Sequence, residues 1–395
     1  MQFLRISTRI FPDIGGPAKQ AYLLSKYCSK NKIKTINIAC KPKRNSFIRR
    51  KKINTDFEIH YLPFQAPKIS AGLFTQFLFF FKFVIYGFLK AIKIRKKYKI
   101  DLIHAHSPFP SGFIAYLLSK IFKIPYIYSI HGIDYPYSFL LNLDIKLIAS
   151  NSKKTILISR KILNFLTKKC TSKNLYWIPN AIESSEYFHV NTEDEKEILI
   201  RSINLDSYLK KDDIIIIYIG YMIFLQKVNG MIDFLIAFQN FLKNLKEEGK
   251  REKYKLLFVG EGKYADLLKN KIKDFDLEEQ VLFLGKRNDI KELLAIVNLL
   301  ALTSYVEGSP NVLLEAMASN VPCLGTNVGE IKHIIGNAGY IVNPGDTVDI
   351  EEKLDHFFNL SKKQQTELME QAKKRVLAQF DIDVIGKKWI KLYLP

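Results

Sequence analysis

The sequence predicts an α/β protein built from two Rossmann-like domains, and three observations lead to this prediction. The chain has 395 residues, more than one ordinary core holds, which fits two domains of about 190 residues. Residues 3–28 follow a strand, Gly-Gly loop, helix order, and residues 214–220 form a continuous apolar run of the kind found in parallel sheets. We expect a first domain over residues 1–183, a second over 184–373, and a C-terminal segment, 374–395, that returns to the first.

Composition and charge narrow the class of protein. Hydrophobic residues make up 48% of the chain, as in a globular protein. The four cysteines are far apart with no Cys-x-x-Cys pair, which argues against a disulfide scaffold or metal ribbon and fits a reducing cytosol. Residues 2–6 resemble a short strand interrupted by Arg5 rather than a signal peptide.

The net charge of +21 is unevenly distributed. Residues 1–185 hold 32 Lys and Arg against 7 Asp and Glu, whereas residues 186–395 hold 28 against 32. This asymmetry predicts a polyanionic partner for the first half, either nucleic acid or an anionic membrane. A solvated, lysine-rich surface is the alternative.

The first domain begins with a strand at residues 3–6 and a loop at 7–19 that contains Gly15 and Gly16. A helix is expected over 18–28, and strands over 35–40 and 57–62, with a basic loop at 41–52 between them. Glycines in such a first loop let backbone N–H groups approach a phosphate. An ordinary turn is the alternative for Gly15 and Gly16.

Residues 73–94 predict a helix that carries eight aromatic side chains. Lysines interrupt its apolar run, so it does not fit a membrane-spanning helix. An interfacial helix, with aromatics such as Phe79, Phe80 and Phe83 among the acyl chains and lysines at the headgroups, fits better. The alternative is a helix buried against the first sheet.

Three histidines lie near the ends of two further predicted strands, 101–106 and 126–130. His104 and His106 alternate, so they share one face of their strand, but no third ligand makes them a metal site. His131 opens a His-Gly-x-Asp turn at a strand's carboxyl end, where open α/β sheets bind ligands. A structural turn histidine is the alternative. Strands at 155–159 and 175–178 complete the first sheet.

The second domain begins after a polar stretch, 183–212, that we interpret as a linker and domain edge. Strands are expected at 214–220, 255–260, 281–285 and 297–302, and helices at 349–358 and 364–380. The last of these strands leads into a turn with Glu307, after which Ser309 suits a helix N-cap and Pro310 a first helical turn. Glu315 then lies on the first turns of that helix.

Two carboxylates and a helix N-terminus therefore converge on one edge of the second sheet. Carboxylates accept hydrogen bonds from hydroxyls, and helix N–H groups bind phosphate. A nucleotide sugar offers both groups. The alternative is that Glu307 and Glu315 are ordinary surface residues.

The stretch EGSPNVLLEAMASNVPCLGTNVGEIKHII, with Glu307 eight residues before Glu315, resembles the signature of the retaining nucleotide-sugar glycosyltransferases of family four. This resemblance implies the GT-B architecture, in which two Rossmann-like domains face a central cleft. The His131 turn and the Ile178-Pro-Asn180 segment also match the family's pattern.

The resemblance further implies roles for individual residues. Glu307 faces the transferred sugar and His131 positions it, as the candidate catalytic residues. Glu315 holds the ribose, and Gly15, Gly16 and Lys227 lie near the diphosphate. The backbone at Ser309, Pro310, Asn311 and Val312 adds hydrogen bonds to the donor. The chain departs from the family at Tyr221, where relatives carry a phosphate-binding Arg.

We therefore expect a retaining hexosyltransferase-type enzyme that moves a sugar from a nucleotide-diphosphate donor to a lipid-linked or surface-glycan acceptor. The donor is its substrate; we expect no cofactor, bound metal or nucleic-acid partner, and a cytoplasmic location at the inner membrane face. A non-catalytic GT-B partner subunit is one alternative, because of Tyr221. A nucleic-acid-binding protein that uses the basic half is another, although no recognition motif supports it. Sugar-nucleotide epimerases share the fold, but the two motifs together favour transfer.

Overall fold

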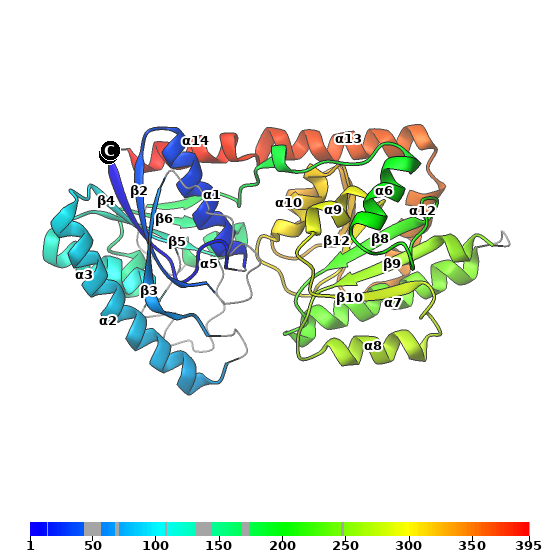
Figure 1. Cartoon of the computed structure of the whole chain (residues 1–395), viewed down its shortest axis with the longest axis horizontal. Coiled ribbons are helices and arrows are strands. Elements are labelled where there is room, and N and C mark those ends of the chain that lie inside the picture. Colours follow the sequence, from blue (N-terminus) through cyan, green and yellow to red (C-terminus); the bar gives the residue numbers. More distant parts are fainter. Residues whose placement is uncertain are drawn as a thin grey trace. The chain divides into compact units, whose positions relative to one another are not determined.

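The computed structural model describes residues 1–13, 15–42, 57–67, 71–106, 109–131, 144–167, 174–245 and 249–394. It divides the chain into two compact units (Figure 1). Unit 1 comprises Met1–Ala181 together with Ile382–Pro395, and unit 2 comprises Ile182–Asp381. Each unit contains one parallel sheet with helices on its faces, so the prediction of two Rossmann-like α/β domains is confirmed.

Unit 1 has a seven-stranded sheet in the order β3-β2-β1-β4-β5-β6-β7, with every neighbouring pair parallel. Its strands are β1 (Gln2–Ile6), β2 (Lys34–Lys41), β3 (Glu58–Gln65), β4 (Leu102–Ala105), β5 (Tyr126–Ile130), β6 (Lys154–Leu157) and β7 (Leu175–Trp177). Its helices are α1 (Gly16–Lys30), α2 (Leu73–Lys97), α3 (Ser111–Phe122), α5 (Arg160–Thr167), α14 (Ile382–Tyr393) and the π-helical turn η2 (Asp144–Ala149).

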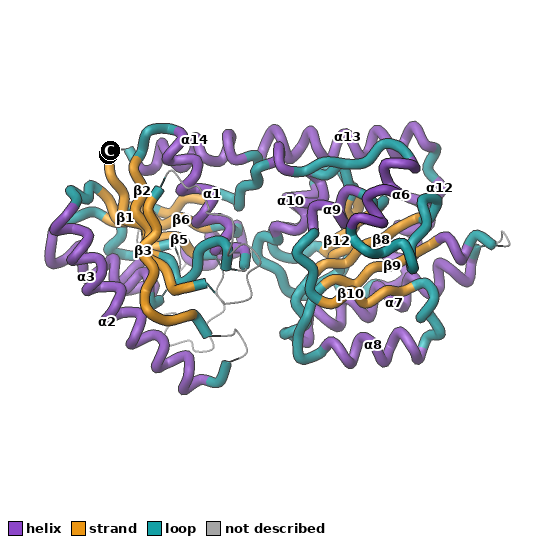
Figure 2. The backbone as a smooth tube through the Cα atoms, in the orientation of Figure 1, coloured by secondary structure: helices purple, strands orange, loops and turns teal. Residues whose placement is uncertain are grey.

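The two faces of this sheet carry different cores because side chains alternate along each strand. Leu4 and Ile6 of β1 face α2 and α3, which lie side by side on one side (Figures 1 and 2). Phe3 faces the opposite side, where α1 and α14 pack together. Arg5 shares that second face and is 0% exposed.

Unit 2 has a six-stranded parallel sheet in the order β10-β9-β8-β11-β12-β13. Its strands are β8 (Ile214–Ile219), β9 (Tyr254–Val259), β10 (Val281–Gly285), β11 (Leu299–Leu302), β12 (Cys323–Thr326) and β13 (Gly339–Val342). Its helices are α6 (Glu193–Ser202), α7 (Leu225–Asn244), α8 (Ala265–Asp274), α9 (Ile290–Ala295), α10 (Asn311–Ala318), α11 (Ile331–Ile335), α12 (Thr347–Asn359) and α13 (Lys362–Gln379), with 3-10 turns η3 (Ser184–Glu186) and η4 (Arg251–Lys253).

The C-terminal segment returns to unit 1 at Ile382, eight residues after the expected start at residue 374. Residue 374 lies inside α13, whose buried Ala372 and Val376 belong to the core of unit 2. The helix therefore holds the chain in unit 2 until it ends at Gln379. The first boundary falls at residue 181, two residues before the expected one.

The stretch that we interpreted as a linker, residues 183–212, contains the helix α6. Thr192 and Glu195 form a capping box, in which each side chain accepts a hydrogen bond from the other residue's backbone N–H. The acidic first turn, with Glu193 and Asp194, also suits the positive end of a helix dipole. The basic loop predicted at 41–52 lies largely outside the described residues.

No helix in the described part of the chain is both long enough and apolar enough to cross a membrane. The longest, α2, spans 25 residues but buries only one narrow face. Phe83, Gly87, Ala91 and Ile94 form this buried face. At Gly87, an added Cβ would stand 2.8 Å from Ile114 of α3, so the glycine permits the close packing of the two helices.

Candidate functional site

The donor-binding candidates of the second domain lie at the carboxyl edge of the unit 2 sheet, around the point where the strand order reverses. From β8, the chain proceeds through β9 and β10 on one side of the sheet and through β11, β12 and β13 on the other. Lys227 follows β8, and Glu307 follows β11. Open α/β sheets bind ligands outside the carboxyl ends of two such strands.

Lys227 and Glu307 meet across this point. The Lys227 ammonium donates a hydrogen bond to Glu307 Oε1 at 2.8 Å. The Glu307 side chain is 9% exposed and that of Lys227 is 25% exposed, so the pair is largely shielded from water. From the sequence, the two residues are expected in separate roles, with Lys227 at the diphosphate and Glu307 at the sugar. The structure brings them together.

Two glycines allow the backbone to hold this pair in place. An added Cβ at Gly230 of α7 would stand 2.1 Å from the Thr303 carbonyl oxygen, so only glycine lets α7 approach the end of β11. The Thr303 hydroxyl donates to the Gly230 carbonyl at 2.6 Å. Gly329 has φ +54°, and a Cβ there would lie 2.2 Å from the Glu307 carbonyl oxygen. Both contacts fix the turn that carries Glu307.

Two helices begin at the same edge, and neither N-cap residue makes a side-chain capping hydrogen bond. Helix α7 starts at Leu225 after Phe224, and α10 starts at Asn311 after Pro310. The predicted N-cap at Ser309 and first-turn position for Pro310 are therefore wrong. Pro310 itself occupies the N-cap, because its ψ of 118° is extended and the helix begins one residue later.

The remaining donor-binding candidates lie on α10, near its first residue. Asn311 and Val312 occupy the first two positions of α10, where backbone N–H groups have no acceptor within the helix. Glu315 is the fifth residue of α10 and is partly exposed. The positive end of the helix dipole thus lies at the edge that also holds Lys227.

Tyr221 lies in the turn after β8, where the family pattern calls for an arginine, and its side chain is 38% exposed. The turn is fixed by backbone hydrogen bonds to the loop after β9. Met222 N–H donates to the Glu261 carbonyl at 3.0 Å, and Tyr264 N–H donates to the Met222 carbonyl at 3.0 Å. A tyrosine supplies no positive charge at this position. Of the residues at the family's motif positions, Lys227 is therefore the one that brings a cation to this edge.

Unit 1 has its own reversal of strand order, between β1 and β4, and the other predicted residues lie there. Gly15 precedes α1 with φ +132°, a conformation that side-chain-bearing residues rarely adopt, and Gly16 is the first residue of the helix. His131 directly follows β5. The rest of its turn, residues 132–134, lies outside the described residues.

His106 is a functional candidate to which the sequence analysis gave no ligand-binding role. Its Nε2 donates to the Pro17 carbonyl at 3.0 Å, which ties the end of β4 to the Gly15–Gly16 loop. Its ring lies 4.4 Å from that of His131, centroid to centroid. The alternation of His104 and His106 was the available signal, and their predicted shared face is confirmed by a 5.2 Å ring contact.

The histidine pair is neutral and has hydrogen-bonding capacity left over. Burial lowers the pKa of His131 to about 4. Burial, together with the neighbouring His131, His104 and Arg5, holds the pKa of His106 well below its usual value. In the described part of the chain, His106 Nδ1 and both ring nitrogens of His131 have no hydrogen-bond partner. Buried nitrogens of this kind suit the hydroxyls of a ligand.

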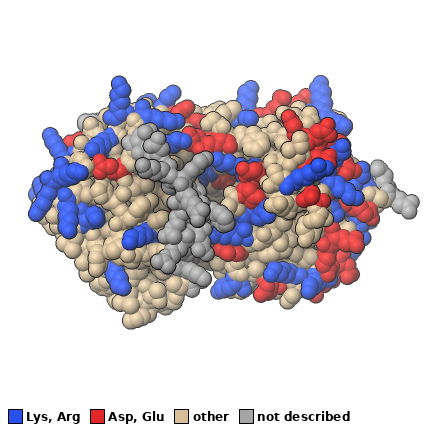
Figure 3. Space-filling view, viewed as in Figure 1, with Lys and Arg blue, Asp and Glu red and all other residues tan. Residues whose placement is uncertain are grey.

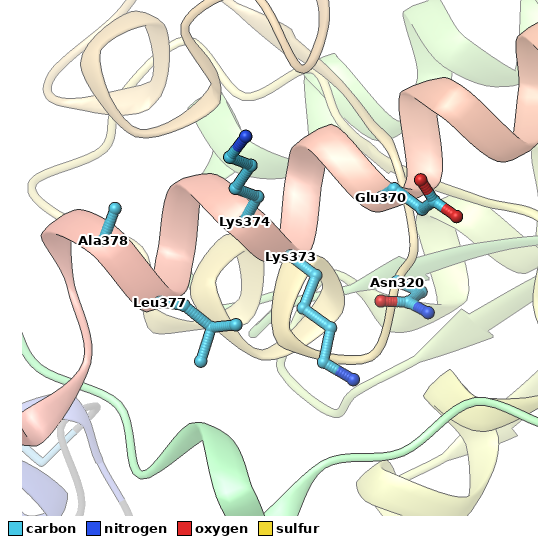
Figure 4. A pocket seen from close by; sticks show the side chains of 6 residues that line it. All are labelled: Asn320, Glu370, Lys373, Lys374, Leu377 and Ala378. Carbon is cyan, nitrogen blue, oxygen red and sulfur yellow. The ribbon is translucent and has the colours of Figure 1, made fainter.

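Two further features of the described residues do not belong to these edges. No group of three or more His, Cys, Asp or Glu side chains there is arranged to hold a metal ion. An open depression of about 510 Å³ lies along α13 and the turn after α10, lined by Asn320, Glu370, Lys373, Lys374, Leu377 and Ala378 (Figure 4). It adjoins the C-terminal end of α10, whereas the donor-binding candidates surround its N-terminal end.

Comparison with known proteins agrees with this fold. The profile described as Glycosyltransferase Family 4 matches residues 14–186, and that described as Glycosyl transferases group 1 matches residues 202–375. The chain is 27% identical to N-acetyl-alpha-D-glucosaminyl L-malate synthase of Bacillus anthracis, over 85% of this chain and 88% of the relative. It is 25% identical to an Escherichia coli UDP-Gal:alpha-D-GlcNAc-diphosphoundecaprenol alpha-1,3-galactosyltransferase, over 68% of this chain and 67% of the relative.

Among solved structures, Anabaena HepE, crystallised with UDP and glucose, has a TM-score of 0.76 at 17% identity and covers 100% of this chain and 99% of its own. The fold and the two profiles define the class, a glycosyltransferase of the GT-B fold. Within that class, the chain belongs to the family-four-like glycosyltransferases. The predicted enzyme type, a hexosyltransferase-type glycosyltransferase, is confirmed.

Proposed function

We propose that this enzyme transfers a sugar from a nucleoside-diphosphate donor to an acceptor hydroxyl with retention of anomeric configuration. The Lys227–Glu307 pair is the observation that carries the proposal. It places one cation and one carboxylate, 2.8 Å apart, at the reversal point of the unit 2 sheet, beside two helix starts without side-chain caps. A diphosphate needs the cation and the helix N–H groups, and a sugar needs the carboxylate.

Each part of the donor would contact the residues whose chemistry suits it. Glu315 accepts hydrogen bonds from the ribose, and the backbone from Ser309 to Val312 donates to the donor. The ammonium of Lys227 exchanges Glu307 for a phosphate oxygen when the donor binds. Glu307 is then left facing the sugar, where its negative charge stabilises the positive charge that develops at the reacting carbon.

Unit 1 would supply the groups that act on the hydroxyls. His131 positions the transferred sugar, supported by its two ring nitrogens without a partner among the described residues. Because its pKa is about 4, it acts as a neutral imidazole near pH 7, which can accept a hydrogen bond or donate one. Gly15 and Gly16 offer backbone N–H groups beside the diphosphate or the acceptor.

We propose a lipid-linked or surface-glycan acceptor and a peripheral position at an anionic membrane, on its cytoplasmic side. The Escherichia coli relative is named for an undecaprenol-linked acceptor. In unit 1, basic side chains outnumber acidic ones, and few acidic atoms appear over it on the face that Figure 3 shows. Helix α2 adds exposed apolar side chains, including Phe74 at 73% and Phe77 at 57% exposure.

Calorimetric titration with UDP-glucose, UDP-galactose and UDP-N-acetylglucosamine tests the proposal. We expect one of them to bind and to be hydrolysed slowly in the absence of an acceptor. Proton NMR of the released sugar, recorded before the anomers equilibrate, then reports retention or inversion. Inversion would contradict the proposed stereochemistry.

A non-catalytic partner subunit is the second candidate, because Tyr221 occupies a position where the family pattern has a phosphate-binding arginine. It predicts that none of the donors binds or is hydrolysed. Replacing Tyr221 with Arg distinguishes the two candidates further. If the enzyme is active, Tyr221→Arg should strengthen donor binding, whereas a protein without the rest of the site gains nothing.

A further inference from the structure

Helix α14 places two aromatic side chains in the interior of unit 1. Trp389 and Tyr393 are 4% and 1% exposed and pack on the face of the sheet that also carries Phe3. The ring of Tyr393 lies 4.6 Å from that of Phe3 and 5.6 Å from that of His104. The last turn of the chain thus reaches the histidine of β4.

The Tyr393 hydroxyl belongs to a closed set of hydrogen bonds. It accepts from Arg5 Nη2 at 3.0 Å and donates to His104 Nδ1 at 2.9 Å. Arg5 Nε also donates to His104 Nδ1, at 3.3 Å. Because Nδ1 accepts, the proton of this imidazole is on Nε2, which donates to the Ser129 hydroxyl at 2.7 Å. The two donors therefore fix the tautomer and orientation of His104.

Arg5 is the charged member of the set and has neutral partners. Its other nitrogen, Nη1, donates to the Ala21 carbonyl at 3.2 Å and to the Ser25 hydroxyl. Among the described residues, no carboxylate forms an ion pair with it, so the buried charge depends on these hydrogen bonds. Loss of the Tyr393 hydroxyl would leave Nη2 without its acceptor, and Arg5 would have to move.

A continuous series of ring contacts connects His104 to the ligand-facing edge of the sheet. The rings of His104 and His106 are 5.2 Å apart, and those of His106 and His131 are 4.4 Å apart. His106 also holds the Pro17 carbonyl of the Gly15–Gly16 loop. His106 thus contacts His104 on one side and both candidate parts of the unit 1 site on the other.

We propose that Tyr393 is a positioning residue of the active site, which acts through His104 and His106 to fix the ring of His131 and the start of α1 at Gly15–Pro17. The C-terminal helix is then part of the catalytic machinery as well as of the fold. The catalytic consequence rests on the role proposed above for His131. The coupling of Tyr393 to the histidine rings does not depend on that role. One result can therefore contradict the coupling, and a different result the role of His131.

Nitrogen-15 NMR of the histidine rings tests the coupling without any substrate. The chain has seven histidines, and single His→Gln variants assign their signals. Wild type is expected to show His104 as the Nε2-protonated tautomer. In Tyr393→Phe, which removes only the hydroxyl, the signals of His104, His106 and His131 should all shift.

Tyr27→Phe is the matched control. It removes a buried hydroxyl at the same α1–α14 contact, where Tyr27 donates to the Asp383 carbonyl at 3.4 Å rather than to His104. Its histidine signals should stay in place, and its Tm should fall less than that of Tyr393→Phe, because no charged partner is left without an acceptor. If the His106 and His131 signals stay at their wild-type positions in both variants, the proposal is overturned. Helix α14 is then only a structural anchor.

Turnover gives the second readout. With a nucleotide sugar that wild type hydrolyses, Tyr393→Phe should lower kcat about tenfold and leave the affinity for the free nucleoside diphosphate within about twofold. Tyr27→Phe should retain wild-type kcat. If wild type hydrolyses no donor, the proposed function fails and the NMR test still decides the coupling. Unchanged kcat in Tyr393→Phe contradicts its role in catalysis.

A second variant covers the case in which Tyr393→Phe does not fold. Ser129→Ala removes the acceptor of the His104 Nε2 proton from the opposite side of the ring. The proposal expects the His106 and His131 signals to shift in this variant too. If only His104 responds, the ring contacts do not transmit its orientation and the proposal is wrong.

Discussion

At the residue scale, the Lys227–Glu307 pair changes how donor binding is understood. Lys227 is already paired with a carboxylate, so a diphosphate that binds as proposed must compete for it. The gain from the new phosphate contact is therefore smaller than that of an unpaired lysine. Under the proposed function, the Glu307 carboxylate loses Lys227 as its partner when the donor binds, and its negative charge then faces the sugar.

Replacing Lys227 with Met tests this competition. A hydrogen bond to a charged group contributes roughly 1.5–3 kcal/mol, and loss of the Glu307 partner offsets part of it, so nucleoside-diphosphate affinity should fall about tenfold. Calorimetry at one ionic strength measures the change. Lys243→Met, at the far end of α7, is the control and should bind like wild type. An unchanged Kd in Lys227→Met would exclude a diphosphate contact.

The buried histidines of unit 1 predict how stability depends on pH. The pKa of His131 is about 4, and those of His104 and His106 are well below the ordinary 6.5. The unfolded chain therefore binds more protons below about pH 6.5, and stability that is fully present above that pH is lost as the pH falls toward 4. At pH 5, His131 alone should cost roughly 2 kcal/mol, because its pKa is about 4 in the folded chain and near 6.5 in the unfolded one.

Urea unfolding at pH 7 and pH 5 measures this loss. His106→Gln should lose less stability between the two pH values than wild type, because one buried neutral imidazole is gone. His356→Gln, which changes an exposed histidine of α12, should keep the wild-type difference. If His106→Gln and wild type lose the same amount, His106 does not carry the pH dependence.

At the element scale, α2 divides its aromatic residues between two environments. Phe83 is fully buried, and Phe79 and Phe80 are partly buried, so these three do not form the face expected to meet a membrane. The exposed face carries Leu73, Phe74, Phe77, Leu78, Phe81, Ile85, Tyr86 and Leu89. Exposed Lys82, Lys93 and the basic last turn accompany it, as in an interfacial helix.

Replacing Phe74, Phe77 and Phe81 with Ser should weaken binding to anionic vesicles, most clearly at high salt, where apolar insertion dominates. Wild-type binding should itself weaken with salt, because each surface lysine near such lipid contributes about 1 kcal/mol. Flotation with phosphatidylglycerol vesicles measures both effects. A matched triple variant of exposed apolar residues in unit 2, Ile198, Val348 and Leu377 to Ser, should bind like wild type. Absence of binding at low salt would refute the membrane surface.

The elements of the sheets could largely be predicted from the sequence, because continuous apolar runs mark buried parallel strands. The candidate residues at the ends of β5, β8 and β11 followed from the same runs. Helix starts were harder. The α10 start was expected at Pro310, but the backbone there is extended. The capping box of α6 lies in an acidic stretch that we interpreted as a linker.

Pairings between distant segments could not be predicted in this way. Arg5 seemed only to interrupt the first strand, yet it lies opposite His104 in the β1–β4 register and bonds a residue 388 positions away. Lys227 and Glu307 are 80 positions apart. Such contacts depend on which strands become neighbours, and a single sequence does not state the strand order.

At the scale of the whole molecule, each unit has one reversal of strand order, with its candidate residues beside it. Unit 2 supplies the carboxylates, the cation and two helix starts without side-chain caps. Unit 1 supplies neutral histidines and a glycine loop. This division suits the proposed function, with a charged donor on unit 2 and hydroxyl-bearing groups on unit 1. We propose that Glu315 binds the nucleotide while Glu307 serves the transfer.

Calorimetry with a nucleoside diphosphate, together with transfer rates, on Glu307→Ala and Glu315→Ala tests this claim most directly. Loss of the ribose hydrogen bonds in Glu315→Ala should weaken binding about 10- to 150-fold, from roughly 1.5–3 kcal/mol. Glu307→Ala should keep nucleotide affinity within about threefold while transfer falls by about two decades or more. If Glu307→Ala loses the nucleotide and Glu315→Ala does not, the roles are reversed. If neither variant changes binding or transfer, the carboxylates are structural and the account is contradicted.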